Sequence, residues 1–312
     1  MITDNAEKTE MMDLKVSNDL IFQRIFGKVG NEQITKSLIE KILGVKINSI
    51  TLNTNKRMQL DKLDGKIGRL DVKAELDDGT VVHIEMQASE YDFMEERFVF
   101  YNDAVFLENI KRGKGYNLKK NKVIGILITD YDLKSTEDIK KYHTIWEYRE
   151  KDNFEKTLIN NKQIHIIELK KFKEEEEKDK DLANWLKFLK IRGMQDMSDI
   201  KSRDEALERA KKELEMLASN REAQEEYIER ENAIRDYVFE MQDNREKGLR
   251  EGRKLGIKEG KEEGIKEGIK EGIEEGKKES KIEIAKKMKE EKIDIEQIAR
   301  ITNLTVEEIK KL

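Results

Sequence analysis

Near its start the chain carries two stretches in which apolar residues recur every three or four positions, the spacing of one helix face. The first set follows Ser17 and is interrupted from Gly27 to Asn31; its members are Ile21, Phe22, Ile25 and Phe26. The second set ends just before Gly44, a residue type that commonly follows the last turn of a helix. Its members are Ile34, Leu38, Ile39, Ile42 and Leu43. The pattern therefore predicts two consecutive amphipathic helices.

The period then changes to two, which predicts strands. After a short strand around Ile50, apolar and polar residues alternate from Arg69 to Leu76 and again from Val81 to Ala88. Between these stretches, Asp78 and Gly79 supply the positive φ that a tight hairpin turn needs. We expect the apolar face of this hairpin to lie in the core and its polar face to lie outside it. The polar face carries Arg69, Asp71, Lys73, Glu75, His83, Glu85 and Gln87.

One helix and three further strands complete the predicted domain. The helix is expected over residues 95–111, with an apolar side that would cover the sheet, formed by Phe98, Tyr101, Val105 and Ile110. The apolar run 123–129 predicts a strand, and weaker strand patterns lie at 144–148 and 164–169. The order of elements indicates an α/β domain over residues 18–172, in which helices flank a mixed sheet. A flexible N-terminus at 1–17 is expected to precede it.

Helices are also predicted beyond the acidic run 174–177, which suggests a domain boundary. Residues 173–246 form a charged helical region, in which Trp185, Leu186 and Leu189 mark one buried stripe. Residues 280–312 predict a short helical hairpin, with one helix from Ile284 to Ile301 and another from Thr305 to Leu312. Asp294 and Thr305 have the spacing of N-terminal helix caps.

A glycine repeat lies between these two helical regions, over residues 247–279. A glycine stands at every fourth position from Gly248 to Gly276, eight in all. If the repeat is helical, the glycines form one row, and close approach of a second copy along it would make the repeat a homodimerisation element. The alternative is a flexible charged spacer, because each glycine costs a helix about 0.8–1 kcal/mol relative to alanine.

The composition restricts the classes of protein to which the chain can belong. Lys and Arg number 62 against 67 Asp and Glu in 312 residues, so any surface that faces DNA must be a local one. The absence of cysteine excludes disulfides and thiolate zinc sites. No apolar run reaches the length of a membrane span, and the N-terminus lacks an apolar signal core. We therefore expect a cytoplasmic protein with no membrane partner.

Candidate chemistry lies on the polar face of the hairpin, where Asp71, Glu85 and Gln87 reach the same side of the sheet. Two carboxylates and a backbone carbonyl, with waters completing the shell, can hold Mg²⁺. Such an ion activates water and neutralises phosphate charge, the two requirements of phosphodiester hydrolysis. From the spacing alone, the alternative is that these are solvated residues on an exposed strand face.

The segment from Asp19 to about Leu133 resembles the recombination-promoting nuclease and transposase family, a branch of the PD-(D/E)xK nuclease superfamily. The matching residues, in order, are Asp19 to Gly27, Gly68 to Lys73, Ile84 to Gln87, Arg97 with Tyr101, and the strand that ends after Thr129. The glycine repeat and the terminal helices also resemble the C-terminal part of this family. The resemblance implies a restriction-endonuclease-like fold, a DNA substrate and Mg²⁺, with Mn²⁺ or Ca²⁺ as alternative cations.

The resemblance also implies roles for the hairpin residues. Asp71 and Glu85 are the expected metal ligands, with the main-chain carbonyl of Met86 as a third. The last Lys of the superfamily motif falls at Gln87, which can orient water or a phosphate but carries no charge. Lys73 is then the nearest candidate in sequence to supply that charge.

Three further residues are candidate DNA contacts: Arg97 in the helix after the sheet, Arg69 on the hairpin, and Gln23 in the first helix, where we expect Lys. The expected function is a metal-dependent DNA endonuclease, a hydrolase that promotes recombination or transposition. One alternative is a non-catalytic DNA-binding protein that uses the terminal helices, against which the acidic Glu307 and Glu308 argue because they would face phosphates. Another is an oligomeric scaffold with an inactive nuclease domain, which the neutral Gln87 would explain.

Overall fold

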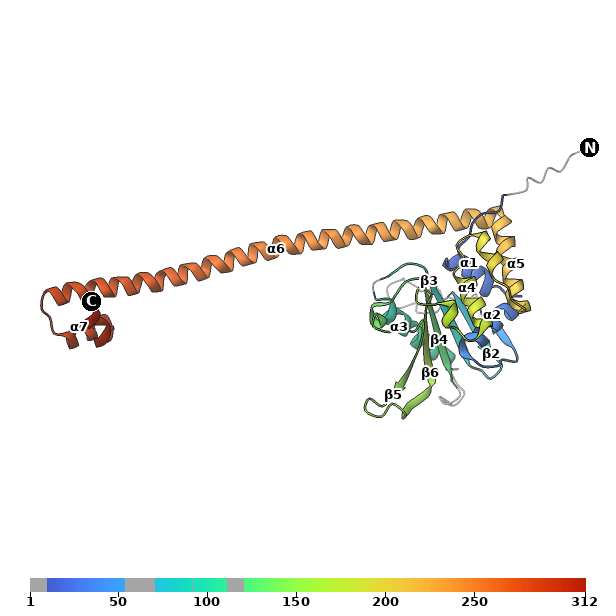
Figure 1. Ribbon diagram of the computed structural model, residues 1–312, viewed down its shortest axis with the longest axis horizontal. Coiled ribbons are helices and arrows are strands. Elements are labelled where there is room, and N and C mark those ends of the chain that lie inside the picture. Colours follow the sequence, from blue (N-terminus) through green and yellow to red (C-terminus); the bar gives the residue numbers. More distant parts are fainter. Residues whose placement is uncertain (1–9, 54–70, 92, 111–120) are drawn as a thin grey trace, which may run out of the picture. The chain divides into compact units, whose positions relative to one another are not determined.

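The computed structural model describes residues 10–53, 71–91, 93–110 and 121–312, and the chain divides into two compact units, 1–235 and 236–312. The first unit contains a six-stranded mixed sheet with helices on both faces (Figure 1). A helical extension follows it. The predicted α/β class, with a mixed sheet flanked by helices, is confirmed.

The two N-terminal helices, α1 (Asp19–Phe26) and α2 (Glu32–Leu43), form where the apolar periodicity predicts them. Asn18 caps α1, because its side chain accepts hydrogen bonds from the backbone amides of Leu20 and Ile21. Gly44 ends α2 in the left-handed conformation, at φ 65°, which glycine adopts without steric cost.

The strands are β1 (Ile50–Leu52), β2 (Val72–Leu76), β3 (Val81–Gln87), β4 (Val123–Thr129), β5 (His143–Arg149) and β6 (Thr157–Glu168). They run in the order β1-β2-β3-β4-β6-β5; β4 is parallel to both of its neighbours, and the other pairs are antiparallel. Gly79, at φ 82°, lies in the turn between β2 and β3. The predicted start of the first hairpin strand, at Arg69, lies outside the described residues.

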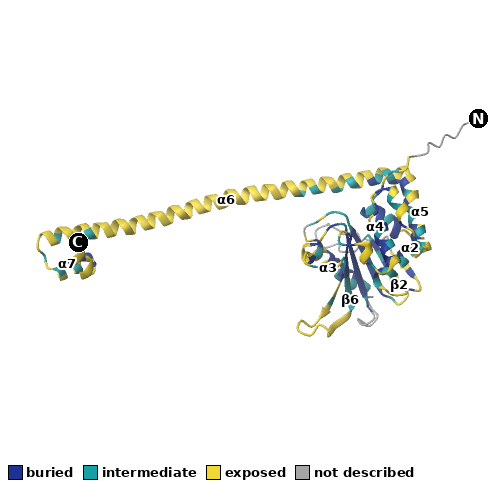
Figure 2. Ribbon diagram, in the orientation of Figure 1, coloured by how far each residue is buried: buried dark blue, intermediate teal, exposed yellow. Residues whose placement is uncertain are grey.

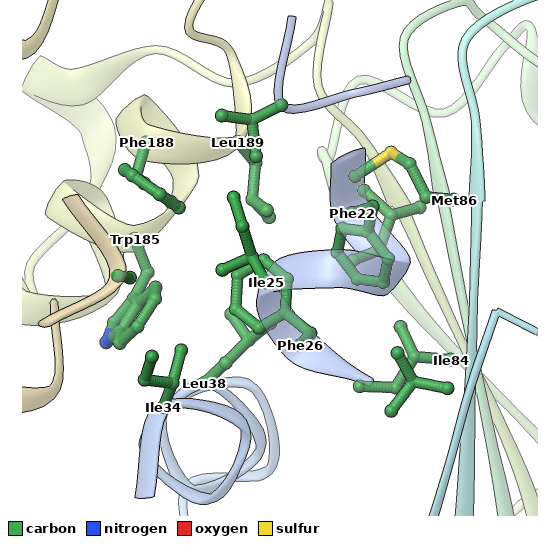
Figure 3. Packing of buried hydrophobic residues seen from close by; sticks show 14 of the residues in the cluster. Phe22, Ile25, Phe26, Ile34, Leu38, Ile84, Met86, Trp185, Phe188 and Leu189 are labelled. Carbon is green, nitrogen blue, oxygen red and sulfur yellow. The ribbon is translucent and has the colours of Figure 1, made fainter. Parts of the chain in front are cut away.

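One face of the sheet packs against α1 and α2, and α4 (Lys180–Leu189) and α5 (Glu205–Ser219) pack in turn on these two helices (Figures 1 and 3). Trp185 is fully buried there and its ring lies 5.9 Å from that of Phe26, so the predicted stripe of α4 is part of the core. The helices that follow the acidic run therefore share one core with the sheet. Short 3₁₀ turns lie at Lys134–Thr136, Glu174–Glu176 and Met194–Asp199.

The other face of the sheet packs against α3 (Met94–Asn109) (Figure 1). All seven residues of β4 are buried, as expected for a parallel strand covered on both faces (Figure 2). The expectation that the polar hairpin face lies outside the core is wrong on β3, where His83 is 0% and Glu85 2% exposed. The reason is that β3 is an inner strand between β2 and β4, and α3 covers this face too.

His83 shows how that polar face is accommodated in the interior. Its Nε2 lies 3.0 Å from Oδ1 of Asn102 on α3, and its ring lies 4.9 Å from that of Phe98. Burial lowers the pKa of His83 to about 4, so the ring is neutral at physiological pH. His83 is therefore a packing residue between β3 and α3.

The C-terminal part consists of α6 (Arg221–Glu290), α7 (Ile295–Thr302) and α8 (Val306–Lys311). The glycine repeat lies inside α6, where most residues are exposed (Figure 2). The prediction of one helix from Ile284 to Ile301 is wrong, because the chain turns between α6 and α7. Lys292 adopts φ 58° in that turn, and the Asp294 side chain caps α7 by accepting from the amide of Glu296. Thr305 and Glu308 form the predicted capping box of α8.

The expected flexible N-terminus is described only from Glu10 onwards. In that described part, Leu14 and Val16 are fully buried in the main core, and the Met12 amide donates to the carbonyl of Ala218 at 2.9 Å. These residues therefore pack against the domain. Within the described ranges, no helix has both the length and the apolar composition needed to cross a membrane.

Candidate active site

Asp71 lies immediately before β2 and beside β3. Its Oδ2 accepts a hydrogen bond from the backbone amide of Met86 at 2.7 Å. The N–H and C=O of one residue point to the same side of an extended strand, so the Met86 carbonyl is also on the Asp71 side of β3. Val72 pairs with Ile84, and continuing this register by one residue sets Asp71 opposite Glu85. The structure thus brings the two carboxyls and the Met86 carbonyl to one place.

Glu85 is a buried carboxyl in the middle of the sheet. Its Oε1 accepts a hydrogen bond from Nε2 of Gln87 at 3.1 Å. Its Oε2 is buried and has no hydrogen-bond partner within the described part of the chain. Burial raises the pKa of Glu85 to about 7, and the positive charge of Arg97 opposes this rise. A buried carboxylate oxygen without a donor needs a proton or a cation to offset the cost of desolvation.

The two carboxyls also affect each other. Burial, and then the negative charge of Glu85, raise the pKa of Asp71 well above its ordinary value, while the hydrogen bond from Met86 opposes the rise. A buried pair of like charges is unfavourable unless something else neutralises it. Such perturbed pairs are enriched at functional sites.

Asp19, in the first turn of α1, is a third carboxyl near this pair. Its negative charge raises the pKa of both Asp71 and Glu85. Its side chain is held by Arg230 of α6, whose Nε donates to Oδ1 at 2.9 Å and whose Nη2 donates to Oδ2. Sequence reasoning assigned neither residue to the site. For Asp19 the available signal was its place at the head of the segment that carries the family resemblance, whereas no pattern singles out Arg230.

Two cations were expected near the carboxyls, and the structure places them differently. Arg97 on α3 acts electrostatically on Glu85, and its Nε donates to the Tyr101 hydroxyl at 2.9 Å. Lys73 instead forms an ion pair with Glu108, with Nζ 2.7 Å from Oε2. Arg97 is therefore the cation that acts on Glu85, whereas Lys73 is paired with Glu108 near the C-terminal end of α3.

Gln23 lies one helical turn after Asp19, on the same face of α1. The end of this helix approaches the hairpin closely, because a Cβ on Gly27 would lie 3.1 Å from the Asp71 carbonyl oxygen and 3.2 Å from Cγ of Gln23. A Cβ there would also lie 2.8 Å from the Gln23 carbonyl oxygen, so a larger residue would force the backbone to shift. The other candidate DNA contact, Arg69, lies outside the described residues.

The residues present fit a divalent cation that prefers oxygen ligands. The unpartnered Oε2 of Glu85 and the carboxylate of Asp71 would supply charge, and the Met86 carbonyl a neutral ligand. Within the described ranges, no three His, Cys, Asp or Glu side chains are grouped closely enough to hold a metal by themselves. The donor set therefore suits Mg²⁺, which commonly takes one or two carboxylates and keeps several waters.

A mixed sheet with an acidic pair across one hairpin is the arrangement that the sequence resemblance implied for a PD-(D/E)xK nuclease. The model of the PD-(D/E)XK nuclease family transposase matches residues 16–244, and the chain belongs to this family. The matched region extends beyond the sheet to α4, α5 and the first part of α6. Searches of curated proteins and of solved structures returned no match.

Proposed function

We propose that the chain is a divalent-metal-dependent endonuclease, a hydrolase that cuts phosphodiester bonds in DNA and promotes recombination or transposition. The observation that carries the proposal is the Asp71–Glu85 pair, in which Glu85 is 2% exposed and its Oε2 has no hydrogen-bond donor among the described residues. A structural carboxylate in such a place would be expected to have a donor. Family membership supports a nucleic-acid substrate.

Each residue of the site would have a separate task. Asp71, Glu85 and the Met86 carbonyl would hold Mg²⁺, with Mn²⁺ or Ca²⁺ as alternatives; the ion supplies charge neutralisation and a more acidic water. Gln87, which already donates to Glu85 at 3.1 Å, would orient the attacking water through its amide. Arg97 would bind a phosphate oxygen near Glu85, because its guanidinium presents several donors in one plane.

A cleavage assay on supercoiled plasmid tests this proposal. We expect the wild-type protein to nick or cut DNA with Mg²⁺ or Mn²⁺ and to be inactive in EDTA. Asp71→Asn and Glu85→Gln should each lower the cleavage rate by at least about 100-fold, since each removes a charge from a site that needs it. Glu75→Gln is the matched control, because Glu75 is an exposed carboxyl on the same strand as the site.

An equal loss of cleavage rate in Asp71→Asn, Glu85→Gln and Glu75→Gln would indicate a general electrostatic effect. Full cleavage activity in Asp71→Asn or Glu85→Gln would contradict the assigned site. A wild-type protein that binds DNA without cutting it, with any of the three cations and on linear, supercoiled and single-stranded DNA, would favour a non-catalytic DNA-binding protein. A protein that does neither would favour an oligomeric scaffold.

A further inference from the structure

The first turns of α6 pack against the beginning of the chain next to the candidate site. Ala223 and Tyr227 are buried, and Glu226 forms an ion pair with Arg24 of α1. Glu231 accepts from Lys15 Nζ and from Asn18 Nδ2, both at 2.8 Å. These α6 residues recur at intervals of three and four, so one face of the helix is fixed against α1.

Arg230 lies on the same face and reaches the acidic side chains. It uses Nε and Nη2 to bind both oxygens of Asp19. Its charge also lowers the pKa of Asp71, against the effect of burial. The Arg230 side chain is 44% exposed, so it is open to solvent while it faces the site. Within the described part of the chain, its Nη1 has no hydrogen-bond partner, and both Nη1 protons remain for a ligand.

The candidate site needs positively charged side chains near its carboxyls if DNA is to bind there. The negative charge of Asp19 acts on both Asp71 and Glu85, and a DNA phosphate that approaches these carboxyls is repelled unless positive charge offsets them. Gln87 supplies no charge, and Lys73 is paired with Glu108 on α3. Arg97 acts on Glu85 from α3, which leaves the α1 side of the site to Arg230.

We propose that Arg230 binds a DNA phosphate while its other edge holds Asp19, so that the long C-terminal helix contributes a residue to the active site. This inference rests on the proposed function. A guanidinium suits the task because its planar fork can bind a carboxylate on one edge and a phosphate on another. The superfamily charge that is missing at Gln87 would then come from a residue far away in the sequence.

The test measures DNA binding, which does not depend on cleavage. A short fluorescent duplex in Ca²⁺ is titrated with the full-length protein by anisotropy, at salt concentrations from about 50 to 200 mM. Because each phosphate contact contributes about 0.9 to the slope of log K against log salt, Arg230→Ala should lower that slope by about 1 and weaken binding several-fold. Arg230→Lys should keep the slope, because it keeps the charge, but bind less tightly because the fork is lost.

Two variants separate a phosphate contact from a structural role. Glu226→Gln weakens the attachment of α6 to α1 without removing Arg230, and it should not lower the salt slope. Arg221→Ala removes an exposed cation of the same helix, which pairs with Glu225, and should leave the slope unchanged. If Arg230→Ala leaves the slope unchanged, or if Glu226→Gln lowers it equally, the proposed contact is wrong.

The nuclease proposal can fail independently of this inference. If the wild type binds DNA but never cuts it, the salt slopes still decide whether Arg230 contacts a phosphate. If the wild type cuts DNA and Arg230→Ala binds with an unchanged slope, only the inference about Arg230 is wrong. A wild type that binds no DNA would contradict both.

Discussion

Gln87 and Glu85 lie two residues apart on β3, and the neutral amide of Gln87 donates a hydrogen bond to the buried Glu85 carboxyl. A neutral donor stabilises the anion less than a cation would. Burial therefore keeps the pKa of Glu85 high, at about 7, although the charge of Arg97 and the hydrogen bond from Gln87 both lower it. The electrostatic balance of the site therefore depends on the arginines that surround it.

We predict that Gln87→Lys preserves or raises the DNA-cleavage rate, because it places a cation where the wider superfamily has one. Arg97→Ala should then lower the rate more in the wild type than in Gln87→Lys, since the two cations would partly substitute for each other. The measurement is the nicking rate of the four proteins of this double-mutant cycle. Identical losses from Arg97→Ala in both backgrounds would show that the two positions act independently.

The residues of the site differ in how far the sequence predicts them. Asp71, Glu85 and Gln87 follow from alternation on two strands joined by a short turn, because a hairpin fixes which residues share a face. Arg230 could not be predicted, since the contact with Asp19 spans 211 residues. It depends on how α6 packs against α1, and a charged helix with few apolar residues gives no periodic signal for that packing.

The contact between α3 and the sheet depends on Gly125 in β4. A Cβ at this position would lie 2.9 Å from both His83 Nε2 and Phe98 Cζ, and 3.0 Å from Asn102 Oδ1. We predict that Gly125→Ala lowers the free energy of unfolding by about 1–3 kcal/mol, the usual cost of overpacking a core. Denaturant unfolding measures this loss.

Gly264→Ala in α6 is the matched control for Gly125→Ala, because a Cβ there meets no atom within 4 Å. That substitution should not lower the stability of the single chain, since alanine favours a helix more than glycine does. Unchanged stability in Gly125→Ala would mean that α3 can shift away from the sheet at no cost.

The strands β5 and β6 bring together two histidines, His143 and His165, with Nε2 of the first 2.9 Å from Nδ1 of the second. Burial, and then the charge of His143, lower the pKa of His165 from 6.5 to about 4; Glu147 opposes this change and Lys122 adds to it. The unfolded state therefore binds the His165 proton more tightly. The stability that neutral His165 contributes is complete above pH 6.5 and is lost as the pH falls towards 4.

We predict that His165→Gln loses less stability than the wild type between pH 6.5 and pH 4, because glutamine does not titrate. Since one pKa unit corresponds to about 1.4 kcal/mol, the difference should be on the order of 3 kcal/mol. Chemical unfolding at several pH values gives the free energy of unfolding of the wild type and of His165→Gln as a function of pH. Parallel curves would show that His165 titrates alike in the folded and unfolded protein.

Most secondary-structure elements could be predicted because each has a strong pattern of its own. The strand β4 is continuously apolar, and the hairpin alternates around a turn that contains Gly79. The end of α6 was misplaced, although Asp294 has the spacing of a helix cap, because the break at Lys292 contains no glycine or proline. Only the left-handed conformation of this lysine and the cap by Asp294 separate the two helices.

For the chain as a whole, the net charge is −5, so no general attraction brings it to DNA. Any affinity must come from local cations such as Arg97 and Arg230, and it should fall at higher salt. The acidic run at 174–177 did not indicate that α4 and α5 pack on the same core as α1 and α2. Long-range packing of this kind has no local signature in the sequence.

We propose that the glycine row of α6 is a homodimer contact, and we predict that the double substitution Gly264→Leu with Gly268→Leu makes the protein monomeric. In the single chain both added side chains would point into open space, so the helix itself should gain stability rather than lose it. Loss of the dimer could then not be attributed to unfolding. Sedimentation equilibrium gives the mass of each protein, and an unchanged mass would support the alternative of a charged spacer.

Binding of a divalent cation by Asp71 and Glu85 together can be measured without DNA cleavage. Titration calorimetry with Mn²⁺, in the absence of DNA, measures this binding directly. We expect one Mn²⁺ site per chain in the wild type and in Glu75→Gln, and a loss of at least tenfold in Mn²⁺ affinity in both Asp71→Asn and Glu85→Gln. Mn²⁺ binding to either of these two variants with the affinity of the wild type would contradict the assignment of Asp71 and Glu85 as metal ligands.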